Sequence, residues 1–247
     1  MQWSGVFPAA TTQFKSDLSV DLDATQGVLD ALVDDGVHGL VVMGTCGENN
    51  SLEPDEKLRV LEAAVAVVAR RVPIIVGVSE MTTPRAARFA TEAARIGADA
   101  LMVLPAMVYV PKPHELEAHF RSVAAASALP IMLYNNPTAY RVNITDDVLG
   151  QLADIETIVA IKESTADTRR FTDLRNMFGD RFVLMAGLDD VALEGLILGA
   201  VGWVSGLTSA FPRESVALVE AVQRGDLACA LRIYRWFMPL LLSLIHI

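Results

Sequence analysis

Short hydrophobic segments recur along the chain, and each is followed by a stretch in which apolar and polar residues alternate with helical spacing. The hydrophobic segments are rich in Val, Ile, Leu and Met and carry few charges, which is typical of parallel strands buried on both faces. We predict strands at 5–12, 39–44, 74–79, 100–105, 131–135, 158–163, 182–187 and 202–206.

The stretches between these segments predict helices. In 54–71, for example, Leu58, Leu61, Val65 and Val68 fall on one helical face. Helix starts carry Asp, Thr or Pro and many ends carry Gly, the residues that cap helices. We predict helices at 21–36, 54–71, 83–97, 113–128, 144–154, 168–179, 189–199 and 211–225.

Strands that alternate with helices favour parallel pairing through right-handed crossovers. About eight such units in 247 residues predict an α/β fold, the (β/α)8 TIM barrel, over residues 1–225. A doubly wound open sheet is the alternative, but no Gly-x-Gly-x-x-Gly follows the first strand. Residues 226–241 predict the start of a helical extension.

The last six residues, 242–247, are Leu-Ser-Leu-Ile-His-Ile. The bases that encode them resemble a transposon adaptor used in sequencing libraries, so we expect a non-native tail rather than a genuine apolar helix end.

Composition narrows the class of protein. The chain is 52% hydrophobic and has a net charge of -10, which argues against nucleic acid or a membrane surface as a partner. Among its long uncharged runs, 195–212 contains several Gly and a Pro, so buried strand and helix are favoured over a membrane span. Neither a signal peptide nor a disulfide framework is evident, and the two cysteines fit a reducing, cytoplasmic location.

Polar residues with catalytic potential follow four of the predicted strands. Lys162 and Glu163 end one strand, Gly-Thr-Cys-Gly-Glu follows a second, Tyr-Asn-Asn-Pro a third and Gly-Leu-Asp-Asp a fourth. Singly, each has an ordinary explanation, because a strand-end lysine can snorkel to solvent and Asn and Pro are common in turns. Together they converge on the carboxyl end of the barrel, where TIM-barrel enzymes place their active sites.

These motifs resemble the dihydrodipicolinate synthase and N-acetylneuraminate lyase family of class I Schiff-base lyases. The resemblance rests on Gly44-Thr45-Cys46-Gly47-Glu48, Tyr134 to Pro137, Ile161 to Glu163 and Gly187 to Asp189, and it extends to about residue 235. It implies a (β/α)8 barrel that needs no cofactor or metal. Family members usually continue with further C-terminal helices and form homodimers or homotetramers, which we expect of the full-length protein.

The resemblance also implies roles for single residues. Lys162 would be the nucleophile that forms an iminium with a 2-oxo acid, and Tyr134 would be the general acid and base. Thr45 would hydrogen-bond Tyr134 and help hold the substrate carboxylate, together with the loop amides of Thr45 and Cys46. Gly44 and Gly47 of the same loop are expected to border the substrate. The turn at Gly187 and the carbonyl of Val204 would line the floor, and Asp189 would complete the site.

Departures from the family pattern bear on the substrate. The synthase has an arginine at the position of Ala139, and paired tyrosines, one acting across a dimer interface, where Ala106 and Met107 stand. Tyr109 is the available substitute for that tyrosine, and Cys46 replaces a second hydroxyl.

Five stretches resemble the branch that deaminates 1-pyrroline-4-hydroxy-2-carboxylate to 2,5-dioxopentanoate and ammonia. They are 6–14, 104–115, 134–140, 162–170 and 186–190. This deaminase is our first expectation, with Asn136, Tyr140, Glu163 and Ser164 handling the substrate's hydroxyl and ring amine. The alternatives are 4-hydroxy-tetrahydrodipicolinate synthase or another pyruvate-dependent aldolase. A non-catalytic binding homologue and a TIM-barrel phosphate enzyme are rivals from other classes.

Overall fold

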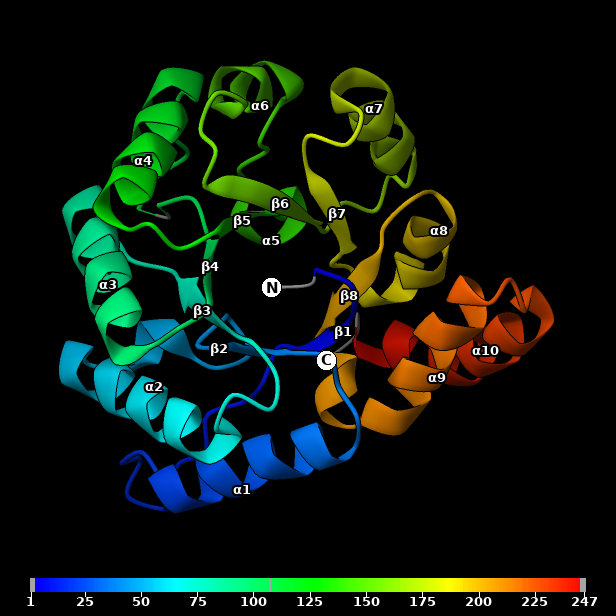
Figure 1. The fold of residues 1–247 in the computed structure, drawn as a ribbon, viewed down its shortest axis with the longest axis horizontal. Helices are drawn as coiled ribbons and strands as arrows, with labels where there is room; N and C mark the ends of the chain where they lie inside the picture. Colours follow the sequence, from blue (N-terminus) through cyan, green and yellow to red (C-terminus); the bar gives the residue numbers. More distant parts are fainter. Residues whose placement is uncertain (1–2, 107, 245–247) are drawn as a thin grey trace.

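Eight parallel strands form a barrel at the centre of the molecule, seen end-on in Figure 1. The structure is a computed structural model and describes residues 3–106 and 108–244; Met107 and residues 245–247 of the expected tail lie outside the described residues. The strands are β1 (Gly5–Pro8), β2 (Leu40–Val42), β3 (Ile74–Val78), β4 (Ala100–Val103), β5 (Ile131–Asn135), β6 (Ile158–Glu163), β7 (Val183–Ala186) and β8 (Gly202–Ser205).

The strands pair in the order β1-β8-β7-β6-β5-β4-β3-β2. The ring closes between β1 and β2, where Ala9 bridges Val41 and the Ala10 N–H donates to the Val41 carbonyl at 2.9 Å. The (β/α)8 TIM barrel is therefore confirmed, and the open-sheet alternative is wrong.

Helices surround the barrel as an outer ring (Figure 1). They are α1 (Leu22–Asp34), α2 (Pro54–Val68), α3 (Thr83–Ile96), α4 (Pro113–Ala126), α6 (Asp146–Leu152), α7 (Arg169–Phe178), α8 (Ala192–Ile197) and α9 (Pro212–Gln223). The predicted helix at 54–71 ends early because Ala69 and Arg70 take left-handed backbone conformations, with φ of 51° and 62°. The predicted helix at 189–199 is divided into a 3-10 turn and α8.

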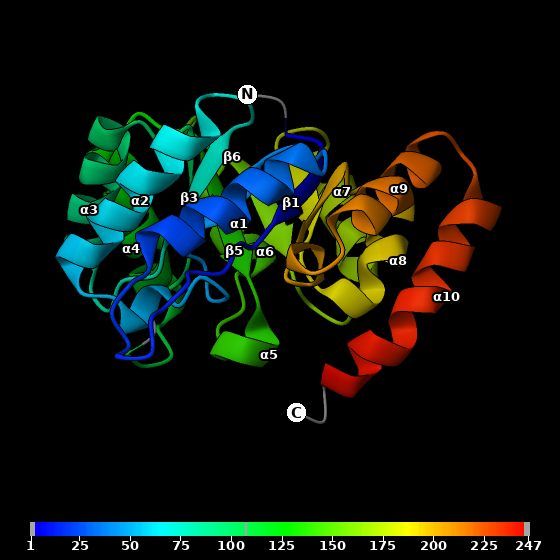
Figure 2. The same cartoon turned by 90° about the horizontal axis from the view of Figure 1, so that it is seen from below.

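Short elements follow several strands at one end of the barrel. These are the 3-10 turns η1 (Asn49–Ser51), η2 (Asp189–Val191) and η3 (Leu207–Ser209) and the helix α5 (Pro137–Tyr140). In Figure 2, α5 projects below the strands and marks the carboxyl end of the barrel. The sequence analysis expected a turn with site residues here and did not predict the helix α5.

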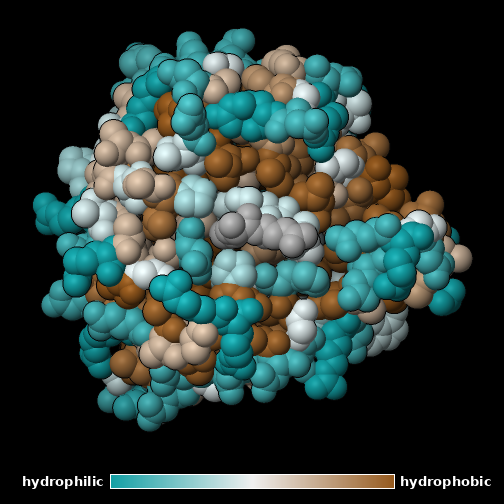
Figure 3. All heavy atoms as spheres, viewed as in Figure 1, coloured by the Kyte–Doolittle hydropathy of each residue, from teal (hydrophilic) through white to brown (hydrophobic). Residues whose placement is uncertain are grey.

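The core has two layers, because side chains along a strand alternate between its two faces. The barrel interior is filled by one side chain or two from each strand, including Phe7, Met132, Met185 and Val204. The opposite strand faces pack against the helices in a larger apolar layer. Figure 3, which views the end opposite α5, shows this layer as brown between mostly teal outer residues.

A last helix, α10 (Leu227–Leu244), packs beside α9 at the edge of the barrel (Figure 2). Its Phe237 stacks edge-on against Trp203 of β8, with ring centroids 6.4 Å apart. The expected extension at 226–241 and residues 242–244 of the expected tail lie in this one helix. Within residues 3–106 and 108–244, none of the helices is both long and apolar enough to span a bilayer.

Candidate active site

Lys162 lies near the carboxyl end of β6 with its side chain directed into the barrel. It shares the strand face of Ala160, which belongs to the interior layer, and only 4% of Lys162 is exposed. The β5–β6 register sets Lys162 beside Tyr134. The Lys162 Nζ consequently sits 3.9 Å from the centroid of the Tyr134 ring, so strand pairing alone brings the expected nucleophile and the expected proton carrier together.

The Tyr134 hydroxyl lies in a polar environment that favours loss of its proton. Asn136 Nδ2 donates a hydrogen bond to this oxygen at 3.2 Å. Burial by itself raises the pKa of Tyr134, but the positive charge of Lys162 and the hydrogen bonds from Asn136 and Tyr140 hold this pKa below its ordinary value. Tyr134 is therefore suited to release and recover a proton beside Lys162.

Thr45 contacts a tyrosine other than the one expected. Its hydroxyl hydrogen-bonds to the Tyr140 hydroxyl, at the end of α5. The Tyr140 ring in turn meets the Tyr134 ring edge-on, with centroids 5.4 Å apart. The predicted direct Thr45–Tyr134 hydrogen bond is wrong, because α5 inserts a second tyrosine between the two side chains.

The loop after β2 is held by contacts that the sequence analysis missed. The buried Thr12 donates to the Gly47 carbonyl at 2.7 Å, and Asn49 Nδ2 donates to the Gly77 carbonyl at 3.0 Å. A Cβ on Gly47 would lie 2.8 Å from the Met43 nitrogen, so only glycine fits there. This anchoring leaves Thr45 and Cys46 exposed at the mouth, while Gly44 is buried behind them.

Gly187, at the end of β7, packs directly against the lysine. A Cβ at this position would come within 2.2 Å of Ser164 Oγ and 2.6 Å of Lys162 Cγ. Ser164 is fully buried, and its hydroxyl has no hydrogen-bond partner among the residues that the structure describes. The structure thus brings Gly187, Ser164 and Lys162 together, with Val204 in the interior layer of the barrel.

Asp189 occupies another side of the mouth. It accepts hydrogen bonds from Trp203 Nε1 and from the Leu207 N–H, both at 3.0 Å. Burial raises the pKa of its carboxyl, against the opposing effects of these hydrogen bonds and of Lys162. The sequence analysis missed Trp203, since a buried tryptophan in a strand gives no signal beyond packing.

Cys46 and Asp189 face a common point. A Cβ on Gly206 would lie 3.4 Å from Cys46 Sγ and 3.6 Å from Asp189 Oδ2. Desolvation raises the pKa of the Cys46 thiol, with Lys162 opposing the shift and Asp189 adding to it. The thiol therefore stays protonated and is a poor nucleophile.

Glu163 lies outside the mouth, although it was expected to handle substrate. It follows Lys162 directly, so its side chain lies on the outer face of β6. There it is fully buried and accepts hydrogen bonds at 3.0 Å from Asn135 Nδ2 and from the Thr165 N–H. Arg170 Nε of α7 lies 3.5 Å from the same carboxylate.

Three further residues, considered because the chain departs from the family pattern near them, are exposed on the surface. Ala139 is exposed on α5, and Arg141 ends that helix in a left-handed conformation with φ 58°. Tyr109 is also exposed, and its hydroxyl donates to Glu115 at 3.1 Å. No cation therefore occupies the position of Ala139, and the Tyr109 hydroxyl is engaged with Glu115.

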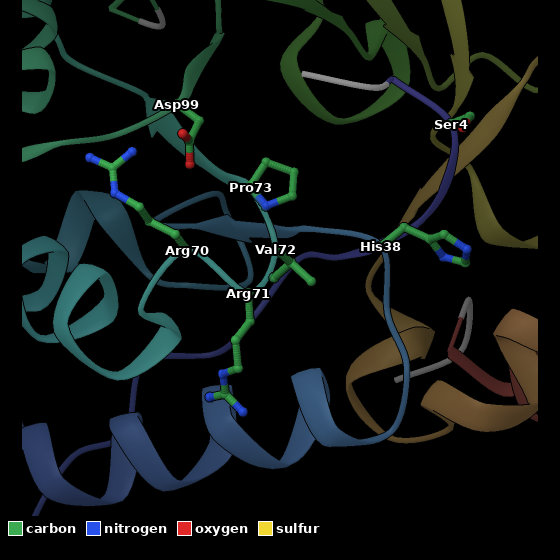
Figure 4. A pocket seen from close by; sticks show the side chains of 7 residues that line it. All are labelled: Ser4, His38, Arg70, Arg71, Val72, Pro73 and Asp99. Atoms are coloured by element: carbon green, nitrogen blue, oxygen red, sulfur yellow. The ribbon is translucent and has the colours of Figure 1, made fainter.

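A hollow of about 480 Å³ lies at the other end of the barrel (Figure 4). His38, Pro73 and Asp99 line it, and each precedes a strand. In Figure 4, Arg71 turns toward α1, where it pairs with Asp34 at 2.9 Å. Because this fold performs its chemistry at the carboxyl ends of the strands, the Lys162 mouth remains the candidate active site.

Comparison with known proteins agrees with this geometry. The model of the dihydrodipicolinate synthetase family matches residues 2–246. The chain belongs to this family. It is therefore a class I lyase, as the resemblance implied.

Two of its relatives are named 4-hydroxy-tetrahydrodipicolinate synthase. The 4-hydroxy-tetrahydrodipicolinate synthase of Phenylobacterium zucineum is 35% identical over 228 residues, covering 92% of this chain and 77% of that protein. The synthase of Methanothrix thermoacetophila is 35% identical over 237 residues, covering 96% and 80%.

Solved structures of the family superimpose closely. The dihydrodipicolinate synthase of Aquifex aeolicus has a TM-score of 0.94 at 32% identity, covering 98% of this chain and 83% of that one. The chloride-inhibited synthase of Acinetobacter baumannii in complex with pyruvate has a TM-score of 0.94 at 27% identity, covering 99% and 84%.

Proposed function

We propose that Lys162 forms a Schiff base with pyruvate or another small 2-oxo acid, and that Tyr134 carries the protons of this reaction. The observation that carries the proposal is the buried Lys162 amine 3.9 Å from the Tyr134 ring at the mouth of the barrel. Pyruvate is the compound bound by the related synthase of Acinetobacter baumannii. An acidic chain can bind such an anion because backbone N–H groups of the loop after β2 supply local positive potential.

The reaction begins when the neutral Lys162 amine attacks the C2 carbonyl carbon and gives a carbinolamine. Tyr134 donates a proton to the carbinolamine oxygen, which leaves as water, and an iminium remains. The iminium withdraws electrons from C3, so a C3 proton can move to the Tyr134 phenolate and leave an enamine. The enamine carbon is then the nucleophile for an acceptor.

Reductive trapping tests this proposal directly. Incubation with pyruvate and borohydride should add the mass of the reduced adduct at Lys162, and peptide mapping locates it. Lys162→Ala should show neither adduct nor turnover, whereas Lys15→Ala, which changes an exposed lysine, should behave like the wild type. An unmodified wild-type Lys162 would overturn the Schiff-base mechanism and favour a binding role.

For the second substrate, the names of the relatives favour aspartate semialdehyde and the synthase reaction. One observation favours the deaminase that the sequence analysis put first: Ala139 offers no charge for an incoming carboxylate. A missing arginine–carboxylate contact costs about 2–5 kcal/mol, or roughly thirty- to several-thousand-fold in kcat/KM. A tyrosine and uncharged polar groups line that side instead, which suits a cyclic imine with a hydroxyl group.

The two reactions can be separated by measuring kcat/KM for each with the same preparation. The synthase assay follows condensation of pyruvate with aspartate semialdehyde, and the deaminase assay follows ammonia release from 1-pyrroline-4-hydroxy-2-carboxylate. Faster condensation assigns the synthase, and faster ammonia release assigns the deaminase. The Schiff base at Lys162 is common to both.

A further inference from the structure

Two tyrosines of one segment meet at the mouth of the barrel. Tyr134 belongs to β5 and Tyr140 ends α5, the short helix that follows. Their rings are nearly perpendicular, at 86°, which is a favourable edge-to-face arrangement. The fold thus holds the second phenol against the first without help from another chain.

The hydroxyl groups form an ordered series. The Asn136 amide nitrogen can only donate, so the Tyr134 oxygen accepts this bond and its own proton is free to be given elsewhere. At the other end of the series, the Tyr140 hydroxyl hydrogen-bonds to Thr45 on the exposed loop after β2. Tyr140 therefore lies between the Tyr134 hydroxyl and the solvent side of the mouth.

The two phenols differ in pKa, and the difference has the direction that a proton relay requires. The bond between the hydroxyls lowers the pKa of Tyr134, while burial first and Tyr134 second raise the pKa of Tyr140. A proton shared by the two hydroxyl groups therefore stays on Tyr140, and Tyr134 is the phenol that ionises beside Lys162. Each time Tyr134 gives a proton to substrate, Tyr140 is placed to stabilise the phenolate.

We propose that Tyr140 is the positioning residue that completes the proton path from Tyr134 to Thr45 within a single chain. This inference rests on the Schiff-base function proposed above. In carbinolamine dehydration, Tyr134 gives its proton to the departing hydroxyl, which leaves as water, and Tyr140 passes its own proton to Tyr134. Thr45 then passes a proton from solvent to Tyr140. The proton later taken from C3 returns to solvent by the same path, so no proton is gained or lost.

The same segment explains how Tyr140 is held. Asn136 Oδ1 accepts from the Ala139 N–H at 3.0 Å and caps α5, while its Nδ2 bonds Tyr134. One side chain therefore fixes both tyrosines in one geometry. Tyr109, the alternative donor expected from the family pattern, is 62% exposed and bonded to Glu115, whereas Tyr140 is bonded to Tyr134.

Tyr140→Phe tests the proposal, because it removes the hydroxyl and keeps the ring. We expect kcat to fall about 10²-fold, the low end for a positioned proton carrier. We also expect the alkaline limb of the pH–rate profile to move to higher pH, since Tyr134 loses a bond that lowers its pKa. Trapping of pyruvate on Lys162 after long incubation should equal that of the wild type.

Tyr109→Phe is the opposing variant and should stay within about twofold of the wild type at every pH. The relay within one chain is refuted if Tyr140→Phe keeps wild-type kcat, or if kcat falls but the alkaline limb does not move. Loss of activity in Tyr109→Phe instead would assign the relay to a partner's tyrosine. Failure of the wild type to trap pyruvate would refute the Schiff-base function itself, a result distinct from all of these.

Discussion

In the mechanism that we propose, the hydroxyl group of Tyr134 carries the proton transfers of the site. Tyr134→Phe should lower kcat about 10²–10⁴-fold, because a positioned proton carrier is lost. The fold should survive, since the ring remains in the interior layer. Steady-state kinetics measures the first effect and thermal unfolding the second; a variant within twofold of the wild type would assign the proton transfer to another group.

The pH dependence of the wild type follows from the same residue. As the proposed general acid, Tyr134 must carry its proton, so we expect kcat/KM to fall as pH rises through the pKa of its phenol. Burial raises this pKa, but the charge of Lys162 and the hydrogen bonds from Asn136 and Tyr140 together outweigh burial and hold the pKa below the ordinary 10.0, so the alkaline limb should lie below pH 10. The Tyr134→Phe profile should lack this limb.

Gly187 leaves room for the Lys162 side chain because it has no side chain of its own. In Gly187→Ala, the new Cβ would lie 2.6 Å from Lys162 Cγ, so the lysine must move. A displacement of about 1 Å at a reacting group can cost about 10²-fold in rate, and we expect a loss of this size in trapping rate and kcat.

Gly150→Ala is the matched control for this substitution. Gly150 lies in α6, with nothing within 4 Å of an added Cβ, so the change should stabilise the protein by about 0.5–1 kcal/mol and leave trapping unchanged. Normal trapping in Gly187→Ala would show that the lysine tolerates the crowding.

At the scale of elements, β6 serves two purposes through its two faces. Lys162 faces the interior, while Glu163 is locked between Asn135 of β5 and Arg170 of α7. This buried cluster joins β5 to β6 on the face opposite Lys162 and Tyr134. It therefore supports the strand register that sets Lys162 beside Tyr134.

Arg170→Ala should destabilise the fold, because it leaves a fully buried carboxylate without its cation. Removing one partner of a buried pair typically costs about 3–5 kcal/mol at neutral pH. Burial already raises the pKa of Glu163, and loss of Arg170 raises this pKa further. A group whose pKa is raised in the folded state contributes stability at low pH, and this contribution is lost as pH rises. The loss of unfolding free energy in Arg170→Ala should therefore be smaller at pH 5 than at pH 7.

Urea unfolding at the two pH values measures this effect. Arg169→Ala is the control, because Arg169 is exposed and pairs with Asp167 on the surface, and it should change stability little at either pH. If Arg170→Ala loses the same free energy of unfolding at pH 5 and pH 7, the loss comes from packing and not from the unpaired carboxylate.

At the scale of the whole molecule, α10 couples the edge of the barrel to the mouth. Phe237 packs on Trp203, and Trp203 donates to Asp189 at 3.0 Å. Tyr234 of the same helix hydrogen-bonds to Glu194 of α8 at 2.9 Å. The turn that carries Asp189 is thus supported from behind by a helix outside the eight repeats.

Phe237→Ala should therefore lower the stability of the whole barrel by about 3–5 kcal/mol, since it empties a site that is 1% exposed. Leu240→Ala, which truncates a half-exposed residue of the same helix, should cost about 1 kcal/mol or less. Urea unfolding compares the two; equal costs would mean that α10 folds independently of the barrel.

The sequence by itself determined the architecture. Its strand and helix periods predicted eight repeats, and a closed barrel is the arrangement that buries strands hydrophobic on both faces. It also identified Lys162 and Tyr134, because strand ends in this fold face one mouth. Parallel pairing then aligned them, with Tyr134 opposite Lys162 in the register.

Only the tertiary structure decided which polar groups touch. Thr45 and Tyr140 are 95 positions apart, and no local pattern indicates that α5 would carry Tyr140 to that loop. Asp189 depends likewise on Trp203 from the next strand, and Glu163 on a helix packed against the outer face of its own strand. Hydrophobic periodicity reports which face of an element is buried, whereas the partner of a polar group depends on where distant segments of the chain are brought together.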